Sequence, residues 1–199
     1  MEHFRAETIP DSADDDPEQK GPGFLRFIVD LLETLIMSVM LFAAINAVSA
    51  RIRVDGASME PTLQTGEFVI VNKLAYKLGS PEIGDVIVFH YPRDPEQEYI
   101  KRIIGLPGDQ VTVRNGKVLV NGHPLVENYI AASPAYENKW TVPADSLFVL
   151  GDNRNNSSDS HSWGFVPMNY VVGRAIFVYW PPSDWGLLNH GASIANAAP

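Results

Sequence analysis

The chain of 199 residues contains no cysteine. This absence excludes disulfide bonds, thiolate metal sites and catalysis by a thiol. Histidine is also scarce, and the five histidines are scattered without the spacing of metal ligands: His3, His90, His123, His161 and His190. We therefore expect no metal site and no cofactor.

Basic residues are few as well, because 15 lysines and arginines face 24 acidic residues, and the formal net charge is −9. Residues 1–23 carry seven of the acidic side chains against only Arg5 and Lys20, with interspersed prolines and almost no apolar periodicity. That composition predicts a disordered, solvated tail. The rest of the chain shows no basic stripe, so we expect no nucleic-acid partner.

One long run without charge stands out, from Thr34 to Ala50. At about 1.5 Å per residue, a helix over this run is roughly 25 Å long, the short end of a bilayer span. Apolar residues upstream recur at helical spacing from Phe24, which predicts an amphipathic lead, and Arg51 and Arg53 mark the exit. The sequence therefore predicts one transmembrane helix within residues 24–53 and a lipid bilayer as its partner.

Two other interpretations of this run are a buried core helix and a cleavable signal peptide. The small residues Val48-Ser49-Ala50 satisfy the rule for a cleavage site. The acidic tail, where a signal peptide has a basic region, argues against cleavage, and a soluble core helix seldom carries so long an uncharged run. Positive charges balance on the two sides, so the positive-inside rule does not orient the helix.

Beyond residue 54 the apolar period changes to two, and the segments are rich in β-branched and aromatic residues. The predicted strands are 67–72, 85–89, 111–114, 117–120, 146–150 and 173–180. Asn115-Gly116 between two of them predicts a type I′ hairpin turn. We expect a mainly β domain of antiparallel strands over residues 54–186, followed by a C-terminal tail over 187–199.

Two residues in this domain point to hydrolytic chemistry. Ser58 lies between a glycine and a proline, Gly56 and Pro61, which constrain the backbone around one hydroxyl. A serine hydroxyl is a weak nucleophile that needs a base, and a lysine serves as one only when desolvation lowers its pKa. Lys101 lies in an apolar strand-like run, and alternation places it on the opposite face from Arg102.

Four motifs occur in a fixed order: Ser58-Met59-x-Pro61-Thr62-Leu63, Gly84–Phe89, Tyr99–Asp109 and Gly151–Ser160. Together they resemble bacterial type I signal peptidases, and the resemblance runs from the membrane segment to about Trp185. It implies a signal-peptidase-like β domain behind one transmembrane helix, and removal of signal peptides from exported preproteins. It also implies Ser58 as nucleophile, Lys101 as base, a cytoplasmic tail and a catalytic domain outside the plasma membrane.

By the same resemblance, Ser157 hydrogen-bonds and orients Lys101, and Asp159 supports its loop by ion pairing. Two positions after this aspartate the family commonly has an arginine, and this chain has His161 there. We also expect Asp152 to pair with Arg102.

The backbone N–H of Ser58 is the natural first donor to an oxyanion. Gly56 stands where some family members have a second, serine donor, so a backbone N–H or water replaces that hydroxyl, or the hole is weaker. The resemblance gives the substrate groove as Val54, Met59, Leu63, Tyr99 and Ile100. Such apolar walls imply small residues at the −1 and −3 positions of an extended substrate.

Three other functions remain open at this point. A Ser-His-Asp enzyme would use His161 and Asp159 with the serine. A self-cleaving repressor relative would share the Ser/Lys dyad, but the membrane segment and the lack of a helix-turn-helix argue against it. A catalytically silent, membrane-tethered β domain would bind extended peptides without cutting them, and loss of the dyad would be its signature.

Overall fold

The computed structural model describes residues 23–194, so the predicted tail over 1–23 lies, except for Gly23, outside the described residues. The chain divides into two compact units, residues 1–43 and 44–199, which are described separately. The first holds most of helix α1, Phe24–Val48, whose side chains are not buried. Its mean hydropathy reaches 2.2, so its length and composition suit a membrane span.

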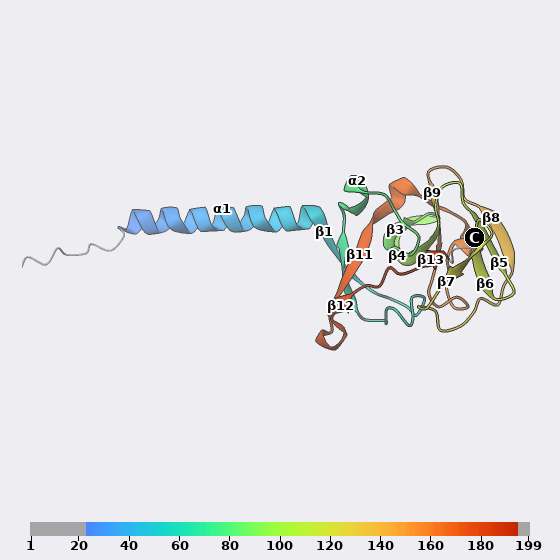
Figure 1. Cartoon of the computed structure of the whole chain (residues 1–199). Coiled ribbons are helices and arrows are strands. Elements are labelled where there is room, and N and C mark those ends of the chain that lie inside the picture. The colour runs from blue at the N-terminus through green and yellow to red at the C-terminus, as the bar shows by residue number, and fades with distance from the viewer. Residues whose placement is uncertain (1–22, 195–199) are drawn as a thin grey trace, which may run out of the picture. The chain divides into compact units, whose positions relative to one another are not determined.

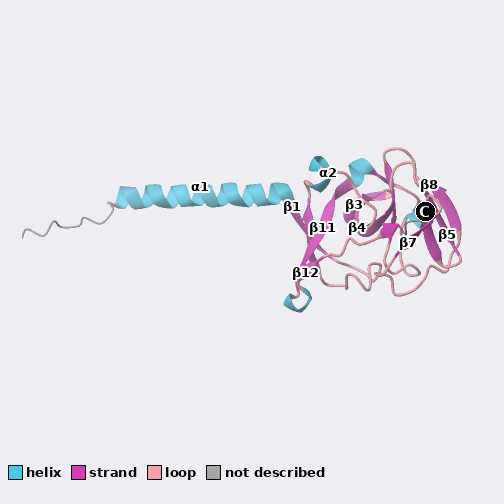
Figure 2. Ribbon diagram, in the orientation of Figure 1, coloured by secondary structure: helices cyan, strands magenta, loops and turns pink. Residues whose placement is uncertain are grey.

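The second unit is built almost entirely of antiparallel strands, with a few short helices at its edges (Figures 1 and 2). The larger sheet contains, in spatial order, β1 Ser49–Arg53, β2 Phe68–Asn72, β11 Val171–Trp180, β3 Val86–Tyr91, β4 Asp94–Gly105, β9 Ser146–Leu150 and β10 Val166–Pro167, and β12 Gly186–Leu187 pairs with β11. This sheet carries both residues of the predicted dyad, one on β4 and one in the loop after β1. The mainly β fold expected from the sequence is confirmed.

The smaller sheet is ordered β13 Ser193–Ile194, β7 His123–Val126, β6 Lys117–Val120, β5 Gln110–Arg114 and β8 Asn138–Thr141. Its central hairpin turns at Asn115 and Gly116, whose φ angles are 51° and 69°. Two positive φ angles in a two-residue connection are the type I′ geometry that the sequence predicted. The short helices are α2 Ala75–Leu78, α3 Ser160–Trp163 and the 3₁₀ turns η1 Met168–Tyr170 and η2 Pro182–Asp184.

Buried apolar side chains form three clusters. One lies beneath the segment that carries Ser58 and combines Met59 and Leu63 with Val88 and Ile100 from the central strands. Burying a side chain of this size stabilises the fold by roughly 1.5 to 3 kcal/mol. The segment around the serine is therefore fixed to the sheet through its own apolar residues.

Two boundaries differ from those predicted. The helix ends at Val48, and residues 49–53 form β1, which pairs with β2 from Ser49↔Asn72 to Arg53↔Phe68. The charges of Arg51 and Arg53 marked a helix exit in the sequence, whereas they are the exposed positions of a strand with Ile52 turned inward. Residues 187–194, expected as tail, extend the sheets through β12 and β13 and bury Leu188.

Candidate active site

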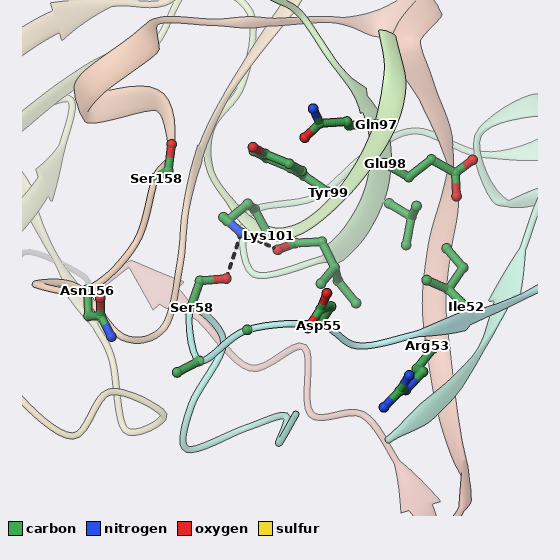
Figure 3. Close-up of a pocket in the computed structure, with 14 residues that line it drawn as sticks. Ile52, Arg53, Asp55, Ser58, Gln97, Glu98, Tyr99, Lys101, Asn156 and Ser158 are labelled. Atoms are coloured by element: carbon green, nitrogen blue, oxygen red, sulfur yellow. Dashed lines mark hydrogen bonds between the residues drawn. The ribbon is translucent and has the colours of Figure 1, made fainter. Parts of the chain in front are cut away.

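Ser58 lies in the loop between β1 and β2, and this loop is tied down on both sides of the serine. Glu60 N–H donates to Ala57 O at 3.2 Å, and Leu63 N–H donates to Met59 O at 2.9 Å. The Met59 and Leu63 side chains are fully buried below the loop. These contacts turn the Ser58 hydroxyl towards the strand that carries Lys101 (Figure 3).

Lys101 is on β4, opposite Ile87 of β3, and only 4% of the residue is exposed. Its Nζ lies 2.8 Å from Ser58 Oγ and 2.8 Å from Ile100 O, the two contacts drawn in Figure 3. Burial lowers the pKa of this lysine from 10.5 to about 8, although the negative charges of Asp159 and Asp152 oppose the shift. A neutral amine at this distance can accept the hydroxyl proton.

A second loop, residues 151–161, lies against the serine loop and is called the catalytic loop below. Asn153 N–H donates to Ser58 O at 3.0 Å, and the Asn153 side chain donates to Ala57 O at 3.1 Å. Thr62 Oγ1 donates to Asp152 Oδ2 at 2.5 Å. The main chain on both sides of the nucleophile is therefore held by the catalytic loop.

Arg102 and Asp152 form the ion pair expected from the sequence. Both side chains are fully buried, and the contact is bidentate, with Nε to Oδ1 at 2.8 Å and Nη2 to Oδ2 at 2.6 Å. Arg102 Nη1 also donates to Gly84 O and Asn189 O. Because the donors of the guanidinium find oxygen partners, the buried charges fix the start of the catalytic loop to β4.

Asp159 is also buried and connects the two ends of the catalytic loop. Its Oδ2 accepts the Gly151 N–H at 2.9 Å, while its Oδ1 accepts the His161 N–H and lies 2.6 Å from His161 Nδ1. The structure thus pairs Asp159 with His161, the residue that stands where the family commonly has an arginine. Neither His161 ring nitrogen has a hydrogen bond to Ser58 in the part of the chain described, so the histidine-triad alternative has no geometric support.

Comparison with known proteins agrees with this geometry. The family model described as "Signal peptidase, peptidase S26" matches residues 28–180. The chain belongs to this family. As a signal peptidase I it is a serine peptidase that cleaves signal peptides.

Similar proteins come from bacteria and a plant. A probable signal peptidase I-2 of Synechocystis is 48% identical over 172 residues, which cover 82% of this chain and 78% of that protein. Signal peptidase I of Bacillus caldolyticus is 38% identical over 162 residues, covering 74% and 85%. The chloroplastic thylakoidal processing peptidase 1 of Arabidopsis thaliana is 37% identical over 190 residues, covering 85% and 55%. A signal peptidase I crystal structure from Enterococcus faecalis is 36% identical, covers 47% of this chain and 95% of that one, and has a TM-score of 0.45.

Within this signal peptidase, Ser157 does not make the hydrogen bond to Lys101 expected from the family motif. Its Oγ is buried and has no hydrogen-bond partner among residues 23–194. The hydroxyl packs against Gly151, where an added Cβ would lie 2.2 Å from Ser157 Oγ and 2.4 Å from Ser58 O. The lysine instead contacts Ser58 and the main chain, so Ser157 lies beside the dyad without joining its hydrogen bonds.

The signal peptidase has a groove of about 490 Å³ at the dyad. Tyr99 and Ile100 line it, as predicted, but Val54, Met59 and Leu63 do not, because their side chains are buried in the core below the loop. The family resemblance, together with their place beside Ser58, had put these three residues in the groove. Proximity along a loop does not determine the direction of a side chain.

Other groove residues were missed by sequence reasoning. Ile52 of β1 and Val88 of β3 form part of the apolar wall of the groove. Val88 is directly opposite Ile100 in the sheet. Asn156 and Ser158 reach the rim from the catalytic loop (Figure 3). The alternation of β1 could have revealed Ile52, whereas the rim residues carry no signal beyond their place in the last motif.

Gly56 also lines the groove, with φ of 89°, a conformation that side chains rarely adopt. It contributes no hydroxyl, so main-chain groups and the Ser58 N–H are the donors that this loop offers to an oxyanion. Among residues 23–194, no group of three or more histidine and acidic side chains is arranged to hold a metal ion.

Proposed function

We propose that this signal peptidase works through a Ser58/Lys101 dyad. Neutral Lys101 accepts the Ser58 proton as Oγ attacks the scissile carbonyl, and the Ser58 N–H stabilises the oxyanion. The resulting ammonium returns a proton to the leaving amine, which departs as the new N-terminus of the mature protein. Lys101 then deprotonates the water that hydrolyses the ester on Ser58. The observation that carries this proposal is the 2.8 Å contact between a buried lysine amine and the serine hydroxyl.

Ser157 is the proposed partner of Lys101 after proton transfer. An ammonium has three N–H donors, and Ile100 O accepts only one of them in the resting site. Ser157 Oγ is a buried acceptor without a partner close to the Ser58 main chain. A buried hydroxyl that lacks a hydrogen bond is costly, which favours a contact made at another stage of the reaction. Asp159 keeps the loop that carries Ser157 closed through its bond to Gly151 N–H.

We further propose that the substrate binds extended, with small residues at the −1 and −3 positions. Ile52, Val88 and Ile100 give the groove apolar walls of branched side chains in the same pocket as Ser58. A pocket of this kind discriminates by about 1 to 3 kcal/mol for each methylene that does not fit. Tyr99 borders the same groove, and its ring centroid lies 5.3 Å from Lys101 Nζ, so its bulk limits the space beside the base.

Helix α1 is proposed to anchor the enzyme in the plasma membrane, with the N-terminus cytoplasmic and the catalytic unit outside. Its length and hydropathy support the anchor. The similarity to a thylakoidal peptidase makes the thylakoid membrane the alternative location. Membrane fractionation combined with protease protection separates the two. Digestion of the catalytic unit in intact spheroplasts supports the plasma membrane, and full protection there contradicts it.

The proposed function is tested by incubating the detergent-solubilised full chain with a preprotein and sequencing the new N-terminus. We expect a single cut after a small residue, and no cut with Ser58→Ala or Lys101→Ala, because the two groups act as one unit. Replacing the −1 alanine of the substrate by tryptophan should abolish cleavage by the wild type. Full activity of Lys101→Ala would refute the dyad.

A further inference from the structure

A loop that connects two strands of the smaller sheet is attached to the catalytic loop. Residues 127–137, which connect β7 to β8, are called the strap. The side chain of Asn155 bonds to the strap in both directions: its Oδ1 accepts Ala135 N–H at 2.8 Å and its Nδ2 donates to Ser133 O at 2.9 Å. The strap is therefore joined to the loop that borders the dyad, although it lines no part of the groove.

The first anchor of the strap is an ion pair. Arg154 of the catalytic loop is 1% exposed, and its guanidinium makes two contacts with the carboxylate of Glu127, one of them at 3.0 Å from Nη1 to Oε2. Arg154 Nε also donates to Gly151 O at 3.1 Å. A buried charge needs such a partner. Glu127 therefore fixes the position of Arg154, the arginine of the catalytic loop.

The second anchor is an aromatic ring between two cations. Tyr129 is buried, its hydroxyl donates to Glu127 at 2.9 Å, and its ring centroid lies 3.9 Å from the guanidinium carbon of Arg102 and 5.8 Å from that of Arg154. Attraction between a guanidinium and a ring face is strong where water is excluded. Since Arg102 holds Asp152, the ring supports the pair that fixes the start of the catalytic loop.

The third anchor is another aromatic ring of the strap, at the other end of the catalytic loop. The ring of Tyr136 stacks on His161 at a centroid distance of 4.3 Å and an angle of 13°. His161 in turn binds Asp159, which holds Gly151 N–H. Within the described part of the chain the hydroxyl of Tyr136 has no hydrogen bond, so its ring alone makes the contact.

We propose that the strap is a positioning element for catalysis, in which Tyr129 and Tyr136 hold Arg102 and His161, the partners of Asp152 and Asp159, and so fix both ends of the catalytic loop around Ser58 and Lys101. This proposal rests on the dyad mechanism above. Neither tyrosine touches the substrate groove or the reacting atoms. Their effect passes through the two aspartates to the Asn153 contact with Ser58 O and to the burial of Lys101.

The environment of the base supports this role. Asp159 and Asp152 are the charges that act most strongly on Lys101, and both raise its pKa against the larger effect of burial. Three other charged or aromatic groups lie at these positions. Arg102 pairs with Asp152, His161 pairs with Asp159, and Tyr99 lies beside the amine. A loosened strap weakens the contacts of both aspartates with their partners and admits water to the lysine. Each change favours the ammonium form and moves the pKa of Lys101 upward.

The test compares Tyr129→Leu and Tyr136→Leu with the conservative variants Tyr129→Phe and Tyr136→Phe in the full detergent-solubilised chain. Active sites are counted by the burst of acyl-enzyme, so misfolded protein does not affect kcat. We expect each leucine variant to lose about tenfold or more in kcat, because small displacements of catalytic groups are costly, with KM within about threefold. The acid limb of the pH profile should move upward by about half a unit.

The phenylalanine variants decide between positioning and simple structural support. Tyr136→Phe should equal wild type, because the lost hydroxyl has no partner, and Tyr129→Phe should recover most of kcat by keeping the ring. Glu137→Gln is the control, since this strap glutamate accepts Asn115 N–H in its own sheet and should leave kcat and the pH profile unchanged.

Wild-type kcat per active site and an unmoved pH limb in the leucine variants would overturn the proposal. If Tyr129→Leu fails to fold, Tyr136→Leu, at a half-buried position, decides alone. An equal loss in Tyr136→Phe and Tyr136→Leu would also overturn it. Full activity of Lys101→Ala would instead refute the dyad, whatever the strap variants do, so the two failures are distinguishable.

Discussion

Gly151 is the position at which the smallest substitution should have the largest effect on catalysis. A Cβ added there would lie 2.2 Å from Ser157 Oγ, 2.7 Å from Ser157 Cβ and 2.4 Å from the carbonyl oxygen of Ser58. The φ angle of Gly151 does not itself require glycine. Gly151→Ala therefore tests close approach alone. The added methyl group would have to displace the main chain of the nucleophile, because one of the atoms it meets is the carbonyl oxygen of Ser58.

The expected magnitude follows from these contacts. Overpacking by one methyl group in a tight site costs about 1 to 3 kcal/mol of unfolding free energy. The Ser58 carbonyl is also held by Asn153 N–H, so it moves only together with the serine loop. A displacement of about 1 Å in a catalytic group can lower the rate roughly a hundredfold. We therefore expect Gly151→Ala to lower kcat by about two orders of magnitude, with KM little changed.

The assay is kcat per active site from burst kinetics, with the unfolding free energy from urea titration. The double variant Gly151→Ala/Ser157→Gly removes the contact with the serine side chain but leaves the one with Ser58 O, so it should recover only part of the lost unfolding free energy and none of kcat. Gly186→Ala is the matched control, because its Cβ would meet only Asp184 O at 3.9 Å. Wild-type kcat in Gly151→Ala would refute the reasoning.

Three further outcomes are expected. Ser157→Ala should lower kcat by roughly ten- to a few hundred-fold with KM unchanged. The reason is the loss of a hydrogen bond to a charged group, which is worth about 1.5 to 3 kcal/mol. A turnover rate equal to that of the wild type would leave the serine with a packing role only. Asp152→Asn should lower the unfolding free energy in urea by about 3 to 5 kcal/mol, because it leaves the fully buried Arg102 without its counter-charge; a loss below about 1 kcal/mol would contradict this. His161→Ala should retain about a tenth of wild-type cleavage in the preprotein assay, whereas a histidine base would make it as inactive as Ser58→Ala.

The sequence predicted the mainly β fold, several of its strands and the burial of Lys101. Short runs of β-branched and aromatic residues in β3 and β9, and two residues able to adopt positive φ at Asn115-Gly116, specify strands and a turn locally. Apolar neighbours of Lys101 predicted its burial, and burial is what lowers its pKa. These features depend on residues close together in the chain, which is why they can be recognised without the fold.

The rest of the site depends on contacts that no local pattern encodes. The rings of Tyr129 and Tyr136 both come from the strap, and Tyr129 meets Arg102 whereas Tyr136 meets His161. The loop around Ser58 has no period, so the inward direction of Met59 could not be inferred from its place beside the nucleophile. A strand as short as β1 was likewise hidden by charges that also suit the end of a membrane helix.

The central claim is that Lys101 is neutral when it meets Ser58. It is tested most directly by the pH dependence of the single-turnover acylation of Ser58 in the full chain. Because the neutral amine is the active form, the rate should rise with pH, with a midpoint near the pKa of about 8 that burial gives this lysine, and then level off. A rate that is flat from about pH 5 to pH 9, or a midpoint near the ordinary histidine value of about 6.5, would contradict a lysine base.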